Sequence, residues 1–289
     1  MYKKDYEMIE RSAKIIDKLR SECPLTHCIT NYVTINDCAN AVLAIGGSPA
    51  MANEEPEIED FVNIADATVI NMGTLLADQI EAMQKAAIHT KKTDTPLVID
   101  PVAVGVSKLR NDATVDLINK SNPYIIRGNM SEIKAIAKLF DVDENDSKAK
   151  GVDVSDEDII KLENLENNAE LIKDVASKLD TTINVSGPVD IISDGENVYA
   201  IDNGEPIMSK ITGSGCMLTC VLGAFSSVSS PLEASIIGSM SMAIAGELAY
   251  NKVQINNLGS GSFRTFLIDE LYNMNEEKIN RYAKLYKVI

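Results

Sequence analysis

A glycine-rich turn ahead of an apolar segment is the part of the sequence best suited to bind an anion. The run T-G-S-G-C over residues 212–216 precedes the apolar residues 217–228, which predict a helix. Glycines let a backbone approach an anion closely, and the N–H groups at a helix start point toward it with the positive end of the helix dipole. The sequence therefore predicts an anion hole formed by Gly213, Ser214 and Gly215.

The thiol of Cys216 stands at the same predicted helix start. A positive potential at this point predicts a lowered thiol pKa, so that the sulfur can accept a proton or act as a nucleophile. The plainer interpretation makes Cys216 a small apolar residue that follows a glycine turn and enters the core. For an isolated G-x-G that plainer interpretation is the better one, but the residues around this turn favour chemistry.

Polar residues follow four predicted strands at the point where each strand ends. They are Asn31, Asp100, Arg127 and Ser186, which end the runs T-H-C-I-T, P-L-V-I-D, P-Y-I-I-R and T-T-I-N-V-S. Ligands of open α/β sheets bind outside the carboxyl ends of the parallel strands, so these residues are candidates for a site. Each of them alone is better explained as turn chemistry.

The segment N-M-S-E over residues 129–132 has two interpretations. Asn129 at a helix start and Glu132 three residues later match a capping box, in which both side chains bond backbone N–H groups. Alternatively, Glu132 and Asp100 form a carboxylate pair that holds hydrated Mg²⁺ beside nucleotide phosphates. An anion hole, a carboxylate pair and the cation Arg127 would be sufficient for phosphoryl transfer.

Five short apolar runs, the four above and A-T-V-I-N-M over residues 67–72, alternate with helical patterns along the chain. This alternation predicts an α/β fold with a mainly parallel sheet covered by helices on both faces. Segments 189–193 and 198–201 predict an antiparallel hairpin at a sheet edge, and from Gly215 onward almost everything is predicted to be helical. A single domain over residues 1–289 is the simplest organisation. The acidic segment 141–170 is predicted to be a surface excursion.

Composition excludes several classes of protein. A net charge of −16 over 289 residues disfavours binding to nucleic acid and to anionic membranes. The most apolar stretch, 234–250, contains Glu247 and is predicted to be a buried core helix rather than a membrane span. Five cysteines without a C-x-x-C spacing, and no export signal, predict a cytoplasmic protein with reduced thiols.

Two further motifs are missing, and their absence narrows the chemistry. The sequence has no G-x-x-x-x-G-K-[ST], which disfavours a P-loop enzyme, and no G-x-G-x-x-G after the first strand, which disfavours a hydride-transfer enzyme. With only His27 and His89, a three-histidine metal site is impossible.

The motifs together resemble those of the hydroxyethylthiazole kinases, thiamine-salvage enzymes of the ribokinase-like superfamily. The matching stretches are P-L-T-H-C-I-T-N-Y-V-T-I-N-D-C-A-N, G-G-S-P-A-M, D-P-V-A-V-G, I-I-R-G-N-M-S-E-I and T-G-S-G-C-M-L-T. The resemblance implies a ribokinase-like three-layer α/β/α sandwich. It also implies Mg²⁺- and ATP-dependent phosphorylation of the hydroxyl of 4-methyl-5-(2-hydroxyethyl)thiazole, by a homotrimer whose thiazole site lies between subunits.

The resemblance also implies roles for individual residues. Asn31, Val33, Met51 and Gly213 would contact the thiazole, Arg127 and Ser186 would contact ATP, and Asp100 and Glu132 would support Mg²⁺. Cys216 stands where most ribokinase-like enzymes carry an aspartate as general base. Because a thiol is a poorer acceptor at neutral pH than a carboxylate, Cys216 either takes the proton or chiefly positions the hydroxyl.

Three residues depart from the family pattern, namely Ala103 in place of glycine, Cys28 in place of asparagine and Asp37 in place of an aromatic residue. Ala103 is expected to crowd the backbone near the phosphates.

Two other functions stay open on the sequence alone. One is a related kinase that acts on a hydroxymethylpyrimidine or a pyridoxal-like alcohol, and the other is a catalytically silent nucleotide-binding protein.

Overall fold

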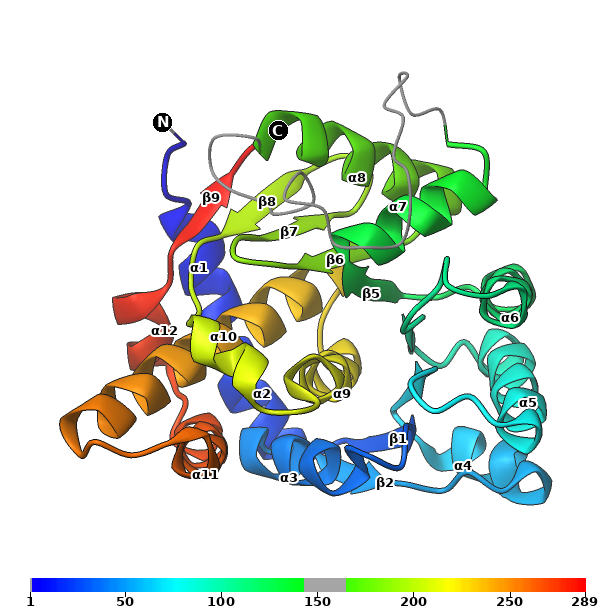
Figure 1. Cartoon of the computed structure of the whole chain (residues 1–289), viewed down its shortest axis with the longest axis horizontal. Helices are drawn as coiled ribbons and strands as arrows, with labels where there is room; N and C mark the ends of the chain where they lie inside the picture. The colour runs from blue at the N-terminus through cyan, green and yellow to red at the C-terminus, as the bar shows by residue number, and fades with distance from the viewer. Residues whose placement is uncertain (1, 143–164) are drawn as a thin grey trace.

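The protein is built on one large twisted sheet (Figure 1). The computed structural model describes residues 2–142 and 165–289. Over these residues the strands form a nine-stranded sheet in the order β2-β1-β3-β4-β5-β6-β7-β8-β9. The parallel strands are β1 (Leu25–Ile29), β2 (Ser48–Ala50), β3 (Ala67–Asn71), β4 (Leu97–Asp100), β5 (Ile125–Asn129) and β6 (Thr182–Ser186).

The five apolar runs expected to form parallel strands do so, within one or two residues at each end. A short strand, β2, also joins the parallel part at the edge beside β1. It was not expected, because its three residues S-P-A form no apolar run. Burial on both faces explains why these strands are continuously apolar: Val69 packs into one core and its neighbour Ile70 into the other.

The antiparallel part follows β6. Strands β7 (Asp190–Ser193) and β8 (Val198–Ile201) form the expected hairpin. The expectation that this hairpin is the sheet edge is wrong, since β9 (Leu285–Lys287) pairs with β8 beyond it. Strand β9 is also an exception to the expected all-helical C-terminal part. Three residues are too few to show a strand pattern in the sequence, and the pairing depends on residues far along the chain.

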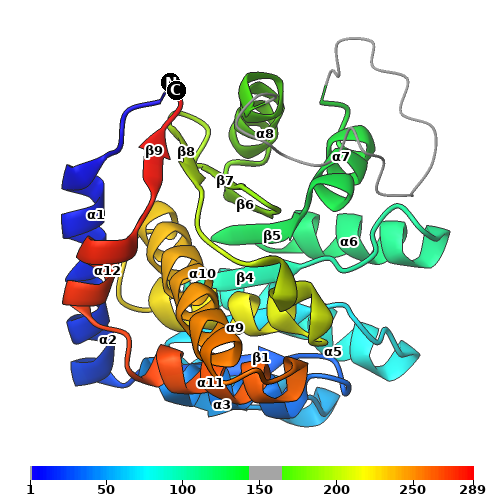
Figure 2. The ribbon, with the colours of Figure 1, turned by 60° about the vertical axis from the view of Figure 1, so that its left-hand side comes forward.

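Helices cover both faces of the sheet, which confirms the predicted three layers (Figure 2). On one face lie α4 (Ile58–Ile64), α5 (Ala77–Thr93), α6 (Lys108–Lys120), α7 (Met130–Leu139) and α8 (Leu165–Leu179). On the other lie α1 (Tyr6–Ala13), α2 (Ile15–Glu22), α3 (Ile35–Ile45), α9 (Ser214–Ser226), α10 (Pro231–Ile255), α11 (Ser260–Tyr272) and α12 (Glu276–Tyr282). Short 3₁₀ helices, η1 (Glu55–Glu57) and η3 (Pro206–Lys210), complete the described elements.

Helix α10 contains the apolar stretch 234–250 and is the buried core helix that was expected. Its length and composition would allow a membrane crossing, but 78% of its most apolar window is buried inside the protein. The acidic segment 141–170 lies mostly outside the described residues. Its last part, 165–170, forms the first turns of α8 and is therefore not an irregular excursion.

Helix α9 lies unusually close to the sheet at Gly223. A Cβ atom at this position would lie 2.3 Å from Val69 Cγ2 in β3 and 3.2 Å from Thr26 Cγ2 in β1. Real Cβ atoms do not approach other atoms so closely, so α9 can rest on these strands only because residue 223 has no side chain. This contact sets the distance between the sheet and helix α9, whose first turn carries Cys216.

We therefore expect Gly223→Ala to lower the free energy of unfolding by about 1–3 kcal/mol, because the added methyl group overpacks the core. Thermal and urea unfolding of the purified protein measure this change. Gly261→Ala is the matched control, since Gly261 also lies in a helix but has nothing within 4 Å of its Cβ position. The control should be neutral or stabilising by up to about 1 kcal/mol. Equal effects of the two substitutions would contradict the packing argument.

Candidate active site

A chain of hydrogen bonds joins polar side chains at the carboxyl ends of adjacent parallel strands. Asn31 follows β1 and donates through Nδ2 to Asn71 Oδ1 at the end of β3, at 3.0 Å. Asn71 in turn donates to Asp100 Oδ2 at the end of β4, at 2.8 Å, and the two residues are register partners. Arg127 of β5 donates to Asp100 Oδ2 at 3.3 Å and to Ser186 Oγ of β6 at 2.5 Å. The structure thus brings together the four predicted strand-end residues.

Asp100 is the buried centre of this chain, with a side chain that is 1% exposed. Its Oδ2 accepts hydrogen bonds from Asn71, Arg127 and Thr219, the last at 2.7 Å. Its Oδ1 has no hydrogen-bond partner among the described residues. Burial raises the pKa of the Asp100 carboxyl to about 6, although the Arg127 guanidinium and the Thr219 hydroxyl lower it. One carboxylate oxygen is therefore left for a ligand.

The start of α9 has the open N–H groups that an anion hole requires. Gly213 is the N-cap with φ of +80°, and a Cβ atom there would lie 2.2 Å from Thr34 Cγ2, so only glycine fits. No side chain caps this helix, and its first intrahelical bond runs from Met217 N to Gly213 O. The N–H groups of the first turn therefore have no partner within the helix. The Arg127 guanidinium lies against Gly215, 2.6 Å from where a Cβ would be.

Cys216 is half-buried at this helix start and accepts a hydrogen bond from Asn31 Nδ2, at 3.2 Å. The expectation of a lowered thiol pKa is wrong. Burial raises the pKa of Cys216, and the Asp100 carboxylate raises it further, while hydrogen bonds from Thr34 and Asn31 lower it less. Desolvation and a like charge thus outweigh the helix dipole. At neutral pH the group facing the site is a protonated thiol.

Glu132 and Asn129 form the capping box that the sequence suggested. Asn129 Oδ1 accepts from Glu132 N at 2.9 Å, and Glu132 Oε2 accepts from Asn129 N at 2.8 Å. Glu132 Oε1 accepts the N–H of Ala103 at 2.8 Å. Each carboxylate oxygen therefore already binds one backbone N–H, and its remaining lone pairs are what a metal ion or a metal-bound water could use.

These residues fit a hydrated Mg²⁺ ion. Magnesium in phosphoryl-transfer sites is held by one or two carboxylates, substrate phosphates and several waters. The unpartnered Asp100 Oδ1 is such a ligand atom, and Glu132 is near enough to raise the pKa of Asp100. The described residues contain no cluster of three or more His, Cys, Asp or Glu side chains that could hold a metal ion.

Two of the predicted thiazole contacts lie toward the surface. Val33 is 64% exposed in the turn after β1. Met51 follows the edge strand β2 and is half-buried against the core. Val33 in particular does not close over the site within one subunit.

The three departures from the family pattern each have a local structure. Ala103 has φ of +60°, a left-handed conformation that glycine adopts more easily, and its N–H binds Glu132. Asp37, in the first turn of α3, is paired with Arg264 of α11, whose Nε lies 2.9 Å from both carboxylate oxygens. Cys28 is buried behind the site and interacts with Cys220 of α9. The left-handed conformation of Ala103 strains the backbone at this turn.

A cavity of about 530 Å³ opens beside the anion hole. Its polar end contains Arg127, Ser186 and Gly215, and its apolar wall contains Leu218 and Met242. A volume of this size is typical of sites for small organic ligands and cofactors. The cavity therefore joins the phosphate-binding features to a pocket that a nucleobase could fill.

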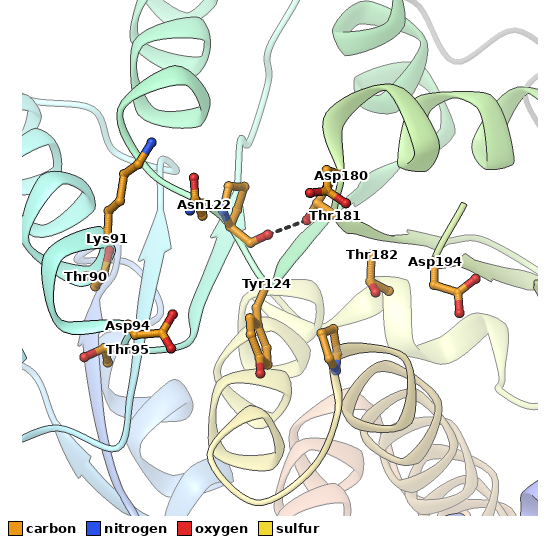
Figure 3. Close-up of a pocket in the computed structure, with 12 residues that line it drawn as sticks. Thr90, Lys91, Asp94, Thr95, Asn122, Tyr124, Asp180, Thr181, Thr182 and Asp194 are labelled. Carbon is orange, nitrogen blue, oxygen red and sulfur yellow. Dashed lines mark hydrogen bonds between the residues drawn. The ribbon is translucent and has the colours of Figure 1, made fainter. Parts of the chain in front are cut away.

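A second cavity, of about 330 Å³, lies at the opposite end of the strands (Figure 3). Residues that precede β4, β5 and β6 line it, and most are threonine or aspartate. No cysteine or histidine is among these lining residues, and the one hydrogen bond that a side chain among them makes to another joins Thr181 Oγ1 to the carbonyl of Pro123. Because ligands of open α/β sheets bind at the carboxyl ends of strands, we assign the chemistry to the other cavity.

Three buried residues of the site were not expected from the sequence. Asn71 links Asn31 to Asp100, Thr219 donates to Asp100, and Thr34 packs on Gly213 and hydrogen-bonds Cys216. Asn71 ends its strand, so the strand-end argument would have found it. Thr219 lies one helical turn after Cys216, but its partner comes from a distant segment, and nothing local indicates that contact.

Comparisons with known proteins give the family and the fold of the chain. The model of the hydroxyethylthiazole kinase family matches residues 16–277. The chain is 71% identical over 281 residues to hydroxyethylthiazole kinase 2 of Methanosphaera stadtmanae, covering 97% of this chain and all of that protein. The structure of a hydroxyethylthiazole kinase protein from Pyrococcus horikoshii is 33% identical, covers 96% of this chain and 99% of its own, and has a TM-score of 0.85. A ribokinase-like superfamily protein of Enterococcus faecalis, 14% identical over 94% of this chain and 95% of its own, has a TM-score of 0.60 and supports the fold alone.

The raised pKa of Cys216 predicts slow alkylation. Only the thiolate reacts with iodoacetamide, so at pH 7.5 we expect exposed Cys23 to be modified at least about tenfold faster than half-buried Cys216. Peptide mapping by mass spectrometry over time measures both rates, and the rate at Cys216 should rise as the pH is raised toward 9 and beyond. Cys23→Ser should remove the fast phase. A fast phase that persists in Cys23→Ser and disappears in Cys216→Ser would contradict the protonated thiol.

Proposed function

The chain belongs to the hydroxyethylthiazole kinase family, and we propose that it transfers the terminal phosphoryl group of ATP to the hydroxyl of hydroxyethylthiazole, in thiamine salvage. One observation carries this proposal. Cys216 stands at the uncapped start of α9, hydrogen-bonded to Asn31 and close to the Arg127 guanidinium that packs on Gly215. An acceptor hydroxyl and a transferring phosphoryl group can meet at this point.

The protein contributes positioning and charge neutralisation to this reaction. The predicted anion hole of Gly213, Ser214 and Gly215, at the uncapped start of α9, and the guanidinium of Arg127 would bind the charge that develops on the phosphoryl oxygens. Cys216 and Asn31 lie where the substrate hydroxyl must sit. Because its thiol is protonated at neutral pH, Cys216 chiefly orients the hydroxyl and is not a strong base.

Asp100 and Glu132 are the residues that would hold Mg²⁺, through Asp100 Oδ1 and through water on Glu132. The ion neutralises charge on the β- and γ-phosphates when bound. Arg127 then has two functions, since it neutralises part of the Asp100 charge and reaches the anion hole. Ser186 holds the other side of the same guanidinium, at 2.5 Å.

We further propose a homotrimer with the thiazole site between subunits, in the cytoplasm. Support comes from Val33, which is 64% exposed and so needs a neighbouring subunit to become part of a closed pocket. Met51 directly follows edge strand β2, which lies at the end of the sheet farthest from β9. The five cysteines are free, as expected for a reducing compartment.

The decisive measurement is ADP release from ATP with Mg²⁺, in the presence and absence of hydroxyethylthiazole. We expect release that depends on the thiazole and on Mg²⁺ and that exceeds release with a hydroxymethylpyrimidine or with pyridoxal by at least tenfold. Preference for one of the other alcohols would show that the protein is a related kinase with a different substrate. Nucleotide binding without turnover of any alcohol would instead indicate a silent nucleotide-binding protein.

Cys216→Ala should lower kcat by about tenfold or more while leaving ATP binding nearly unchanged, because it removes the group that orients the hydroxyl. Steady-state kinetics and calorimetric titration with ADP separate the two effects. Cys216→Ser, which keeps a hydrogen-bonding atom, should retain more activity than the alanine variant. Wild-type kcat in both variants would remove Cys216 from the mechanism.

A charge at the exposed Val33 tests the shared site. We expect Val33→Asp to lower the mass of the assembly in sedimentation equilibrium and to raise KM for the thiazole by about tenfold or more, with KM for ATP little changed. Tyr6→Asp is the matched control, because Tyr6 is 62% exposed on α1, beside the opposite end of the sheet. A wild-type protein that sediments as a monomer and turns over the thiazole would contradict the proposal.

A further inference from the structure

Asp190 is a buried carboxylate in the wall of the 530 Å³ cavity that the mechanism above does not use. It begins β7 and is 8% exposed. Its Oδ1 accepts the N–H of Gly187 at 2.9 Å, which fixes the turn that follows Ser186. No hydrogen bond to its Oδ2 is present among the described residues, and the Gly187 contact is the one hydrogen bond that affects its titration.

The free oxygen of Asp190 lies near a positive charge but is not paired with it. Burial raises the pKa of the Asp190 carboxyl to about 7, while the Gly187 N–H and the more distant Arg127 guanidinium lower it. The Oδ2 atom is not itself fully buried and reaches the cavity, where water or a ligand can donate a hydrogen bond to it. The structure therefore contains a carboxylate acceptor on the cavity wall that has no donor among the described residues.

Two neighbouring polar side chains of the cavity, Asn203 and Ser239, already make hydrogen bonds within the protein. Asn203 Nδ2 donates to Glu247 and to the carbonyl of Tyr282, and its Oδ1 accepts from Lys284 N. Ser239 accepts from Asn184. Glu205 is the other carboxylate in the cavity wall, but it is more exposed and belongs to the rim. Asp190 is thus the buried carboxylate of the cavity wall that has an oxygen left to accept a hydrogen bond.

The chemistry of the nucleotide identifies the missing donor. Phosphate oxygens accept hydrogen bonds, so they cannot serve a carboxylate, and the exocyclic amine of adenine belongs with the base at the apolar wall of Leu218 and Met242. The hydroxyls of the ribose lie between phosphates and base. On the premise that this cavity is the ATP site of the proposed function, we propose that Asp190 Oδ2 accepts a hydrogen bond from a ribose hydroxyl, so that Asp190 selects ribonucleotides over deoxyribonucleotides.

The test compares kcat/KM for ATP, 2′-deoxy-ATP and 3′-deoxy-ATP, with hydroxyethylthiazole as acceptor. In the wild-type protein we expect a loss of about tenfold or more for at least one deoxynucleotide. Asp190→Asn keeps an oxygen for the Gly187 N–H and replaces the free acceptor by a donor, so it should reduce that preference to about twofold or less. Calorimetric titration with ADP and its deoxy analogues should give the same pattern without any turnover.

Two variants separate the effect from simpler causes. Asp202→Asn makes the same charge change beside the cavity without lining it and should keep the wild-type preference. Glu205→Gln tests the competing carboxylate, and loss of the preference there but not in Asp190→Asn would overturn the assignment. Equal use of ATP and both deoxynucleotides by the wild-type protein would also overturn it. Failure of the proposed function is a different result, namely no thiazole-dependent turnover with any nucleotide, and the binding titrations would still test Asp190.

Discussion

The arrangement of the site depends on the buried carboxylate of Asp100. Its Oδ2 is bonded by Asn71, Arg127 and Thr219, which come from β3, β5 and α9. A charge placed where water cannot reach it is tolerated only when such donors surround it, and removal of one donor is costly. The end of β4 therefore fixes the positions of two neighbouring strands and of the helix above them. Asn31 and Ser186 extend the same chain to β1 and β6.

Helix α9 connects this network to the chemistry through its helical period. Gly215, Cys216, Thr219 and Gly223 are spaced so that they recur on one face. Gly215 receives Arg127, Thr219 bonds Asp100, and Gly223 lets the helix settle on β1 and β3. The first turn therefore stands at a defined height above the strand ends, and its uncapped N–H groups face the same region as the thiol.

Burial, together with the same carboxylate, keeps the thiol of Cys216 protonated. A helix start favours a thiolate, but burial and the nearby charge of Asp100 disfavour it more strongly, so the pKa of the thiol is raised. Two groups of like charge cannot both ionise cheaply in one buried site. The structure thereby separates two functions: Asp100 keeps the negative charge that a metal ion requires, and Cys216 stays neutral beside the acceptor hydroxyl.

The sequence by itself determined the strands that end at Asp100, Arg127 and Ser186, the capping box of Asn129 and Glu132, and the glycine turn before Cys216. These follow from local composition and spacing, since apolar runs, caps and turns are set by neighbouring residues. Only the tertiary structure decided the sign of the Cys216 pKa shift, the partners of Asn71 and Thr219, the exposure of Val33 and the pairing of β9. Each of these depends on residues far apart in the chain, because burial, charge and strand pairing are properties of what packs around a group.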